Sequence, residues 1–429
     1  MLPAGAKFTG NFTLPAKSGS GWIVIRSDKH SQLPSQGTRV TPAQASLMPI
    51  IETPNVSPAI KTAASASGWW LVGLNVTVTG SLTAQQYGLV NLGDNAQTTM
   101  ASVPSDLVLD RMYVHGQTST NMSRCVSLNS ARTQVSDSYL SECHGRDFDS
   151  QAIWGGNGPG PFKIVNNTLI GAGENIMFGG SDPKIPGLVP SDIEIRRNYV
   201  YTPLSWKGVW QRKNLLEFKN ASRVLIEGNV FEGSWADAQT GWAIIFKSAN
   251  QGGNCLWCRT TDVTFRKNLV TNAGAGINVA PKGSQPSDTT ARRILISENV
   301  LENIGVGSYT GDRRGFQLLA NTYNVTIERS VLNGNLTAAL FLEGTYAPVF
   351  RDNAWTRGQY GVIATGAGSG IPALDKGAPG WSWNNMAMIG STQSGYPTGT
   401  SWFSNESSVP LAAQVRSIVS QATAGVIIP

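Results

Sequence analysis

The sequence predicts an all-β protein, a right-handed parallel β-helix with three strands in each of about ten coils. Three observations lead to this fold class. A short motif centred on asparagine recurs along the chain, a second apolar motif recurs between its copies, and glycine is abundant (47 residues) while charged residues are sparse (14%). The chain has 429 residues, which is long for one compact core. A solenoid avoids this limit, because each coil buries its inner face only against its neighbours.

The asparagine motif places an apolar residue three positions before an asparagine and another two positions after it. Its copies are centred on Asn75, Asn167, Asn198, Asn229, Asn268, Asn299 and Asn353, and on the substitutes Met112, Ser138 and Ser330. The steps from Asn167 to Asn198 and from Asn198 to Asn229 are both 31 residues long. Other steps differ in length, which indicates loops of variable size between otherwise regular coils.

Each copy reads as a strand, a two-residue bend and a second strand. The residue before the central position, such as Gly228, Asn166 or Asp137, is often of a type that tolerates a left-handed backbone. We expect the asparagine side chain to point inward and to bond its counterparts in the coils above and below, about 4.8 Å away. Such a ladder satisfies backbone groups of the bend that no regular sheet reaches.

A third strand per coil lies between the asparagine motifs. Its copies are residues 125–130, 151–156, 175–180, 215–220, 243–248, 276–281, 316–321, 339–344 and 361–366. Alternation predicts that Ile176, Phe178, Leu216, Phe218, Ile244 and Phe246 point inward. It predicts that Ile153, Met177, Glu217, Lys219, Ile245, Lys247 and Asn278 point outward. The longest loops, at 180–190, 201–214, 232–241 and 249–261, flank this strand in the middle coils.

The motifs divide the chain into three segments. Residues 1–67 are irregular and proline-rich, and we expect them to form an N-terminal cap and entry segment. Residues 68–370 carry the repeats and are predicted to form the β-helix. Residues 371–429 are predicted to be a C-terminal tail. Within it, residues 409–424 have the pattern of a short amphipathic helix, which could cap the exposed sheet edge of the last coil.

Composition narrows the class of protein. The net charge is +6 with dispersed Lys and Arg, which argues against a nucleic-acid-binding patch and leaves either a basic groove for an acidic polysaccharide or a charge that serves solubility. No apolar run is long enough to span a membrane. The polar, turn-rich composition favours an extracellular or periplasmic protein whose signal peptide is absent from this sequence.

The four cysteines leave alternatives open. Cys255 and Cys258 form a single C-x-x-C segment, which favours a loop disulfide or two thiols over a zinc site. Cys125 and Cys143 could pair across one coil, but sequence spacing alone does not decide this.

The coil and ladder pattern of residues 68–370 resembles the right-handed parallel β-helix superfamily typified by pectate lyases. The run DSQAIWGGNGPGPFKIVNNTLIGAGENIMFGGSD (149–182) is similar to bacterial β-helix repeat proteins without an assigned function. The superfamily includes polysaccharide lyases, glycoside hydrolases, pectin esterases, epimerases, phage tailspikes and adhesins, so the resemblance implies a polysaccharide partner. His115 and His144 each precede a glycine but follow none, which argues against the hydrolases that carry Gly-His-Gly.

In folds of this kind, substrate lies in a groove along one sheet, and the third-strand face of the middle coils is the candidate here. The candidate catalytic residues are Lys219, Lys247, Glu174 and Glu217. The candidate substrate-binding residues are Trp206, Trp210, Arg212, Trp235, Gln151, Asn175 and Trp257. The candidate metal ligands are Asp147, Asp149 and Asp182, whose hard oxygen atoms suit calcium.

Two reactions fit these residues. Uronate β-elimination needs positive charge beside the carboxylate and a base that removes the neighbouring proton, and Lys219 or Lys247 suits the second role. Glycoside hydrolysis instead needs two carboxylates about 5 Å or about 6.5–9.5 Å apart, for which Glu174 and Glu217 are the candidates. The structural alternative for Glu217 and Lys219 is a solvated ion pair on one strand face.

Two classes of function therefore remain. The first is an enzyme acting on an acidic polysaccharide, a lyase or another depolymerase. The second is a non-catalytic carbohydrate-binding or structural β-helix of the adhesin or spike type. The tryptophans fit both classes, because indoles either stack on sugars or pack loops onto the solenoid. The sequence does not predict an oligomeric state.

Overall fold

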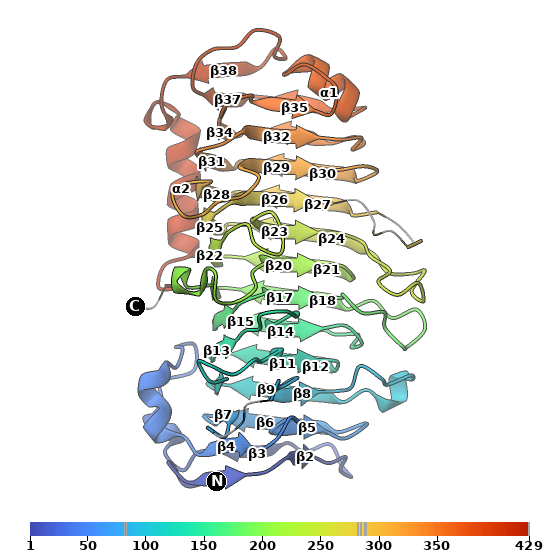
Figure 1. Ribbon diagram of the computed structural model, residues 1–429, viewed down its shortest axis with the longest axis vertical. Coiled ribbons are helices and arrows are strands. Elements are labelled where there is room, and N and C mark those ends of the chain that lie inside the picture. Colours follow the sequence, from blue (N-terminus) through green and yellow to red (C-terminus); the bar gives the residue numbers. More distant parts are fainter. Residues whose placement is uncertain (81, 83, 281–282, 284, 287–289, 428–429) are drawn as a thin grey trace. The chain divides into compact units, whose positions relative to one another are not determined.

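The computed structural model describes the chain except residues 81, 83, 281–282, 284, 287–289 and 428–429. The chain divides into two compact units, Met1–Gln211 and Arg212–Pro429, here called the first and the second unit. Each unit consists of three parallel sheets in which every third strand of the chain is a neighbour (Figure 1). Sheet A follows the asparagine bend, sheet B holds the third strands and sheet C precedes the bend. The predicted right-handed parallel β-helix is confirmed.

In the first unit, the strands of each sheet follow one another in chain order. Sheet A contains β1 (Lys7–Thr9), β4 (Ile50–Thr53), β7 (Asn75–Val78), β10 (Tyr113–His115), β13 (Tyr139–Cys143), β16 (Thr168–Gly171) and β19 (Tyr199–Tyr201). Sheet B contains β2 (Phe12–Leu14), β5 (Ile60–Thr62), β8 (Val90–Leu92), β11 (Arg124–Leu128), β14 (Gln151–Gly155) and β17 (Glu174–Phe178). Sheet C contains β3 (Ile23–Arg26), β6 (Ser67–Val72), β9 (Ser105–Asp110), β12 (Ala131–Ser136), β15 (Phe162–Val165) and β18 (Ser191–Arg196).

The second unit repeats the same arrangement. Sheet A contains β22 (Val230–Ser234), β25 (Leu269–Ala273), β28 (Val300–Ile304), β31 (Val331–Gly334), β34 (Ala354–Thr356), β37 (Met386–Ile389) and β38 (Thr400–Phe403). Sheet B contains β20 (Asn214–Phe218), β23 (Trp242–Phe246), β26 (Ala275–Val279), β29 (Arg314–Leu318), β32 (Ala338–Leu342) and β35 (Val362–Ala364). Sheet C contains β21 (Ala221–Glu227), β24 (Thr260–Arg266), β27 (Arg292–Ser297), β30 (Tyr323–Glu328), β33 (Val349–Arg351) and β36 (Ser382–Asn384).

Buried asparagines form a ladder inside each unit. In the first unit, the backbone N and the Nδ2 atom of Asn167 donate to Oδ1 of Asn198 at 2.9 and 3.0 Å. In the second unit, Asn229 donates in the same way to Asn268, and Asn268 donates to Asn299. Because each side chain bonds both the amide and the backbone of the next coil, the ladder holds the bend in register.

The bend before the ladder is left-handed. The residue before each ladder position has a positive φ, such as 58° at Asn166, 66° at Gly228 and 55° at Lys267. One assignment is wrong by a single position. Asn75 pairs in register with Tyr113, so the residue that matches Met112 is Leu74, and Asn75 lies on the outside, where its Oδ1 is 3.1 Å from Nε2 of His115.

The alternation predicted for sheet B holds except at one residue. Ile153 pairs in register with the inward Ile176 and is therefore an inner residue, while Trp154 pairs with Met177 on the outer face. The prediction for Ile153 is wrong because Gln151 pairs with Glu174 and not with Asn175, so the copies that begin at 151 and 175 are offset by one residue. In the second unit, Glu217, Ile245 and Asn278 align on the outer face as predicted.

The regular coils extend beyond the expected segment 68–370. Strands β1 to β5 already form coils within residues 1–67, and β36 to β38 continue the sheets beyond residue 370. In the bend before β37, the residue after the left-handed Asn385 is Met386, so the asparagine motif does not mark this coil. Between β3 and β4, the short helices η1 (His30–Gln32) and η2 (Pro42–Leu47) belong to a segment that packs against the outer face of sheet A. Elsewhere the chain forms η3 (Met100–Ser102), η4 (Leu204–Trp206) and η5 (Glu406–Ser408).

The helix predicted within residues 409–424 is present as α2 (Pro410–Ala422), but it does not cap the last coil. It packs against the outer face of sheet A in the second unit, where Ala412, Val415 and Val419 join a buried cluster with Val300 and Val331. The helix that packs against the last strands of sheet B, β32 and β35, is α1 (Ile371–Gly377). Within the described residues, no helix has the length and apolar character needed to cross a membrane.

Both cysteine pairs are disulfides. Cys125 of β11 and Cys143 of β13 are joined across the interior of one coil, and Cys255 is joined to Cys258 in the loop after β23. All four cysteine side chains are buried. The pairing of Cys125 with Cys143 ties sheet B to sheet A within the first unit.

Replacing Asn268 by Leu should lower the free energy of unfolding by about 1–3 kcal/mol, because the N–H of Asn229 and the carbonyl of Ile226 lose a buried partner. Urea denaturation followed by circular dichroism measures this change. Asn333 of β31 is exposed, so Asn333→Leu serves as the control and should change stability by less than about 0.5 kcal/mol. Equal stability of the two variants would contradict a structural role of the ladder.

Replacing Val415 by Asp should lower stability by about 3 kcal/mol and promote association, because a carboxylate would enter the apolar contact between α2 and sheet A. Thermal denaturation and static light scattering test both effects. Ser417 lies on the exposed side of the same helix, so Ser417→Asp should remain monodisperse and as stable as the wild type. A monodisperse, fully stable Val415→Asp protein would show that sheet A does not need this cover.

Candidate functional site

In the first unit, three polar side chains stand in line on sheet B at the starts of their strands. Arg124, Gln151 and Glu174 are partners in register on β11, β14 and β17. Nε2 of Gln151 donates to Oε2 of Glu174 at 2.7 Å, and Nε of Arg124 donates to Oε1 of Gln151 at 3.3 Å. The amide of Gln151 therefore links a cation to a buried carboxylate, so the candidates Gln151 and Glu174 lie together.

Arg124 was not among the candidates, yet it organises this cluster. Its guanidinium lies over the Trp154 ring at 3.9 Å from the centroid. Burial lowers the pKa of Arg124, while the nearby charges of Asp149 and Glu174 act in the opposite direction. An arginine stays protonated under all ordinary conditions. The cluster therefore contains one positive charge, on Arg124, and two carboxylates, those of Asp149 and Glu174.

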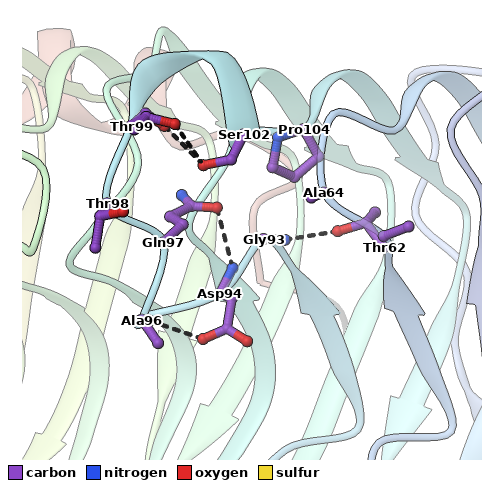
Figure 2. A pocket seen from close by; sticks show the side chains of 11 residues that line it. Thr62, Ala64, Gly93, Asp94, Ala96, Gln97, Thr98, Thr99, Ser102 and Pro104 are labelled. Atoms are coloured by element: carbon purple, nitrogen blue, oxygen red, sulfur yellow. Dashed lines mark hydrogen bonds between the residues drawn. The ribbon is translucent and has the colours of Figure 1, made fainter.

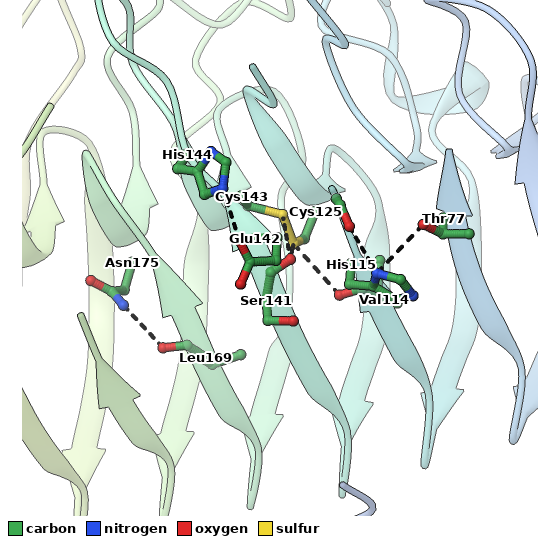
Figure 3. Close-up of a disulfide and its surroundings, with 11 residues drawn as sticks. Thr77, Val114, His115, Cys125, Ser141, Glu142, Cys143, His144, Leu169 and Asn175 are labelled. Atoms are coloured by element: carbon green, nitrogen blue, oxygen red, sulfur yellow. Dashed lines mark hydrogen bonds and ion pairs between the residues drawn. A yellow bond between two sulfur atoms is a disulfide. The ribbon is translucent and has the colours of Figure 1, made fainter. Parts of the chain in front are cut away.

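The tryptophans before β20 pack around a histidine. Trp210 stacks on the ring of His144 with centroids 3.8 Å apart, and Trp206 meets the same ring edge-on at 4.9 Å. Nε2 of His144 lies 2.9 Å from Oε2 of Glu142, beside the Cys125–Cys143 disulfide (Figure 3). Trp210 is buried and offers no free face to a sugar, whereas Trp206 is half-exposed.

The three candidate metal ligands differ in their surroundings. Asp147 is exposed, Asp149 is half-exposed near Arg124, and Asp182 is buried in the loop after β17. Among the residues that the structure describes, no group of three or more His, Cys, Asp and Glu side chains is gathered in a way that could hold a metal ion. The three aspartates do not form such a group, and calcium binding by them stays a prediction.

In the second unit, the two candidate lysines lie in adjacent coils of sheet B. The backbone N of Lys247 donates to the carbonyl of Phe218, which places Lys247 beside Lys219. Glu217 is 2% exposed, accepts a hydrogen bond from Nδ2 of Asn214 at 3.2 Å, and has Oε1 3.8 Å from Nζ of Lys219. Both lysines are half-exposed on the outer face, as the sequence predicts.

The same outer row continues through residues that sequence reasoning missed. Glu217, Ile245, Asn278, Gln317 and Phe341 are successive partners in register. Nε2 of Gln317 donates to Oδ1 of Asn278 at 3.2 Å, and its Oε1 accepts from Arg314.

Arg314, at the start of β29, makes a second arginine–aromatic contact with a residue of this row. Its guanidinium lies 3.8 Å from the centroid of the Phe341 ring. The signal in the sequence is an arginine at the start of one copy of the third strand and an aromatic residue at an outward position in the next copy. Arg124 and Trp154 show the same pattern.

The structure also places the four other substrate-binding candidates, Asn175, Trp235, Arg212 and Trp257. Asn175 is buried and its Nδ2 donates to the carbonyls of Leu169 and Tyr201, so it belongs to the interior of the coil and not to a groove. Trp235 is 1% exposed and lies with its ring 6.0 Å from the guanidinium of Arg212.

Arg212 is itself buried, and its backbone N donates to Oδ2 of Asp237 at 2.7 Å. Trp235 and Arg212 are buried because their loops fold inward onto the coil, and residue type alone does not predict this. Trp257 is half-exposed in the disulfide loop. Glu174 belongs to the first unit and Glu217 to the second, and each has its own partners.

A separate polar cavity of about 410 Å³ lies in the first unit beside the loops that follow β5 and β8. Its walls include Thr62, Asp94, Gln97, Thr99 and Ser102 (Figure 2). The hydroxyl of Thr62 accepts from the Gly93 N–H, and Oδ1 of Asp94 accepts from the Ala96 N–H, so most of these groups serve the loops themselves.

No protein-family model and no curated protein matches the chain. Solved structures are similar in fold. A double mutant of the tailspike protein of E. coli bacteriophage HK620 in complex with a pentasaccharide gives a TM-score of 0.52 and 10% identity, covering 92% of this chain and 60% of that chain. A PL6 alginate lyase in complex with a trisaccharide gives a TM-score of 0.43 and 9% identity, covering 93% and 88%.

A third similar structure, pectate lyase Pel9A, gives a TM-score of 0.36 and 11% identity, covering 71% and 69% of the two chains. At these identities the likeness to the tailspike establishes the parallel β-helix fold and nothing further. This chain spans about 60% of the length of that tailspike protein.

Replacing Arg124 by Met should lower stability by about 2 kcal/mol, because Asp149 and Glu174 would lose a nearby cation while remaining partly desolvated. Urea denaturation measures the effect. Arg132 forms a largely exposed ion pair with Asp106 at 2.7 Å, so Arg132→Met should cost less than about 1 kcal/mol. If both variants lose the same small amount, Arg124 does not organise the cluster.

Proposed function

We propose that this parallel β-helix protein binds an acidic polysaccharide along the outer face of sheet B and cleaves it by β-elimination. The observation that carries the proposal is the placement of Lys219 and Lys247 side by side in adjacent coils, with the buried carboxylate of Glu217 beside one of them. One of the two lysines, as an ammonium, would supply the positive charge that the reaction needs, and the other, as a neutral amine, would supply the base.

The two lysines would have different roles. Lys219, whose Nζ lies 3.8 Å from Oε1 of Glu217, would place a positive charge beside the uronate carboxylate. Lys247 would remove the proton on the carbon next to that carboxylate. The electron pair of the C–H bond then forms a double bond within the ring, and the glycosidic oxygen leaves with the bonding electrons and takes up a proton. The product carries an unsaturated end that absorbs in the ultraviolet.

Further along the row, polar and aromatic groups would bind neighbouring sugars. Arg314 over Phe341 offers a cation and an aromatic ring, while Gln317 and Asn278 are buried and hold Arg314 in place through hydrogen bonds. Because the repeat of the coils is about 4.8 Å, an extended chain laid across them meets one set of side chains after another. Calcium held by Asp147, Asp149 and Asp182 would add positive charge, and loss of activity on chelation tests that prediction.

The second candidate is glycan binding without cleavage. The solved tailspike of similar fold was crystallised with a pentasaccharide, and arginine–aromatic platforms such as Arg314–Phe341 bind sugars without any reaction. Glycoside hydrolysis is a third candidate, with Glu174 in the first unit and Glu217 in the second unit as separate carboxylates to test. The two disulfides favour an oxidising compartment, which agrees with an extracellular or periplasmic protein.

Ultraviolet absorbance of alginate, polygalacturonate and glycosaminoglycan digests tests the proposal. Lys247→Ala should lower the rate about 10²-fold or more, and Lys219→Ala should lower it comparably, with little change in thermal stability because both side chains face outward. Lys163 is exposed on sheet C, so Lys163→Ala is the matched control and should keep the wild-type rate.

Unchanged rates in both lysine variants would place the reaction elsewhere. Binding of an acidic polysaccharide without an absorbing product, and without new reducing ends, would favour the non-catalytic alternative. New reducing ends without ultraviolet absorbance would favour hydrolysis, and Glu174→Gln would then be the informative variant.

A further inference from the structure

Sheet A of the first unit carries a row of tyrosines on its outer face. Tyr113, Tyr139 and Tyr199 occupy the same register position on β10, β13 and β19, with Thr168 of β16 between the last two. Tyr201 lies two residues further along β19. All four phenols are half-exposed. This tyrosine face is defined here by Tyr113, Tyr139, Tyr199 and Tyr201, and it is distinct from the outer face of sheet B.

The rings of the tyrosine face form two aromatic groups, which Thr168 separates along the row. Tyr113 stacks on His115 with centroids 4.1 Å apart and meets Tyr139 edge-on at 5.9 Å. Tyr199 and Tyr201 stack with centroids 5.2 Å apart and an interplanar angle of 10°. On one side, Tyr113 and Tyr139 pack against the buried cluster of Leu33, Val40 and Met48, which restricts their rotamers before any ligand arrives.

One carboxylate stands beside these phenols. Glu142, at the end of β13, is half-exposed and holds His144 through its Oε2 atom (Figure 3). Burial raises the pKa of the Tyr113 phenol, and the charges of Tyr139 and Glu142 raise it further. The pKa of the Tyr139 phenol is raised by burial, by Glu142 and by Tyr201. The phenols of Tyr113 and Tyr139 therefore keep their protons and remain hydrogen-bond donors.

His115 is an uncharged member of the same face. Burial lowers its pKa, against the opposing effects of the Gly116 carbonyl and Glu142. Its ring is fixed by Asn75 and by the carbonyl of Gly116, at 3.1 and 2.8 Å. The charged side chain that acts on the Tyr113 and Tyr139 phenols is thus the carboxylate of Glu142, in contrast to the lysines of sheet B.

We infer that the tyrosine face is a second glycan-binding site, which takes uncharged hexose units. Flat rings in successive coils can stack on the C–H faces of sugars, and the phenols and Glu142 can exchange hydrogen bonds with the hydroxyl groups. Glu142 disfavours uronates, because two carboxylates would face each other. The site goes beyond the proposed lyase function and does not depend on it.

Affinity electrophoresis in gels containing galactomannan, dextran or mixed-linkage β-glucan tests the inference. At least one of these neutral polysaccharides should retard the wild type. Tyr139→Phe should weaken retardation slightly, and Tyr201→Ala and Glu142→Gln should each weaken it about tenfold. Tyr87 is exposed elsewhere in the first unit, so Tyr87→Ala should behave as the wild type.

Thermal denaturation of each variant checks that the fold is intact, and Glu142→Gln preserves size and packing if a tyrosine variant unfolds. Lys219→Ala and Lys247→Ala should leave neutral-glycan retardation unchanged, which separates this site from the one on sheet B. Absence of retardation by all three polysaccharides would overturn the inference. Equal retardation of the tyrosine variants and the wild type would also overturn it, as would displacement of the glycan by choline, since an aromatic cage for cations would then be the better description.

Discussion

The structure depends on one repeated interaction, the hydrogen bond from each bend to the asparagine of the next coil. A left-handed residue turns the chain from sheet C into sheet A and leaves backbone groups that no strand can reach. The side chain of Asn268 meets that need in both directions, since it accepts from the backbone of Asn229 and donates to the carbonyl of Ile226. With this bend fixed, the strands of successive coils stay aligned.

That alignment turns single residues into functional surfaces. An outward side chain at one register position lies next to its counterparts in the coils above and below. Side chains of the same kind at that position therefore form a row along the sheet. Lys219 and Lys247 form such a row on sheet B, and Tyr113 and Tyr139 form one on sheet A. The two surfaces have opposite character, because ammonium groups dominate the first and phenols with a carboxylate dominate the second. We therefore expect acidic glycans to bind the outer face of sheet B and neutral glycans to bind the tyrosine face of sheet A.

Sequence periodicity predicted the parts of the structure that repeat. It identified the asparagine ladder, the left-handed bend and the outward direction of Glu217, Ile245 and Asn278, because each depends on local chemistry at a fixed spacing. It placed Asn75 and Ile153 on the wrong side by one position, since a single-residue shift at a bend or turn leaves the motif looking intact. Burial of Trp235 and Arg212 depends on how loops fold back onto the coil, which sequence spacing does not contain.

The tyrosine face was missed although its signal is present. A tyrosine follows the central position of the motif in three copies, at Tyr113, Tyr139 and Tyr199. The motif is defined by apolar positions on either side of the asparagine, and the residue directly after the asparagine is not one of them. Arg314 and Phe341 were missed for a related reason, because their contact joins two coils and 27 positions of sequence.

The central claim is that rows of outward side chains on the coils bind glycans. A crystal structure of the Lys247→Ala variant soaked with an acidic oligosaccharide tests it most directly. The prediction is a sugar chain lying along the outer face of sheet B, with a carboxylate near Lys219 and a ring near Phe341 or Arg314. Sugar bound away from the outer faces of sheets A and B, or no sugar bound at concentrations that saturate the protein in solution, would contradict it.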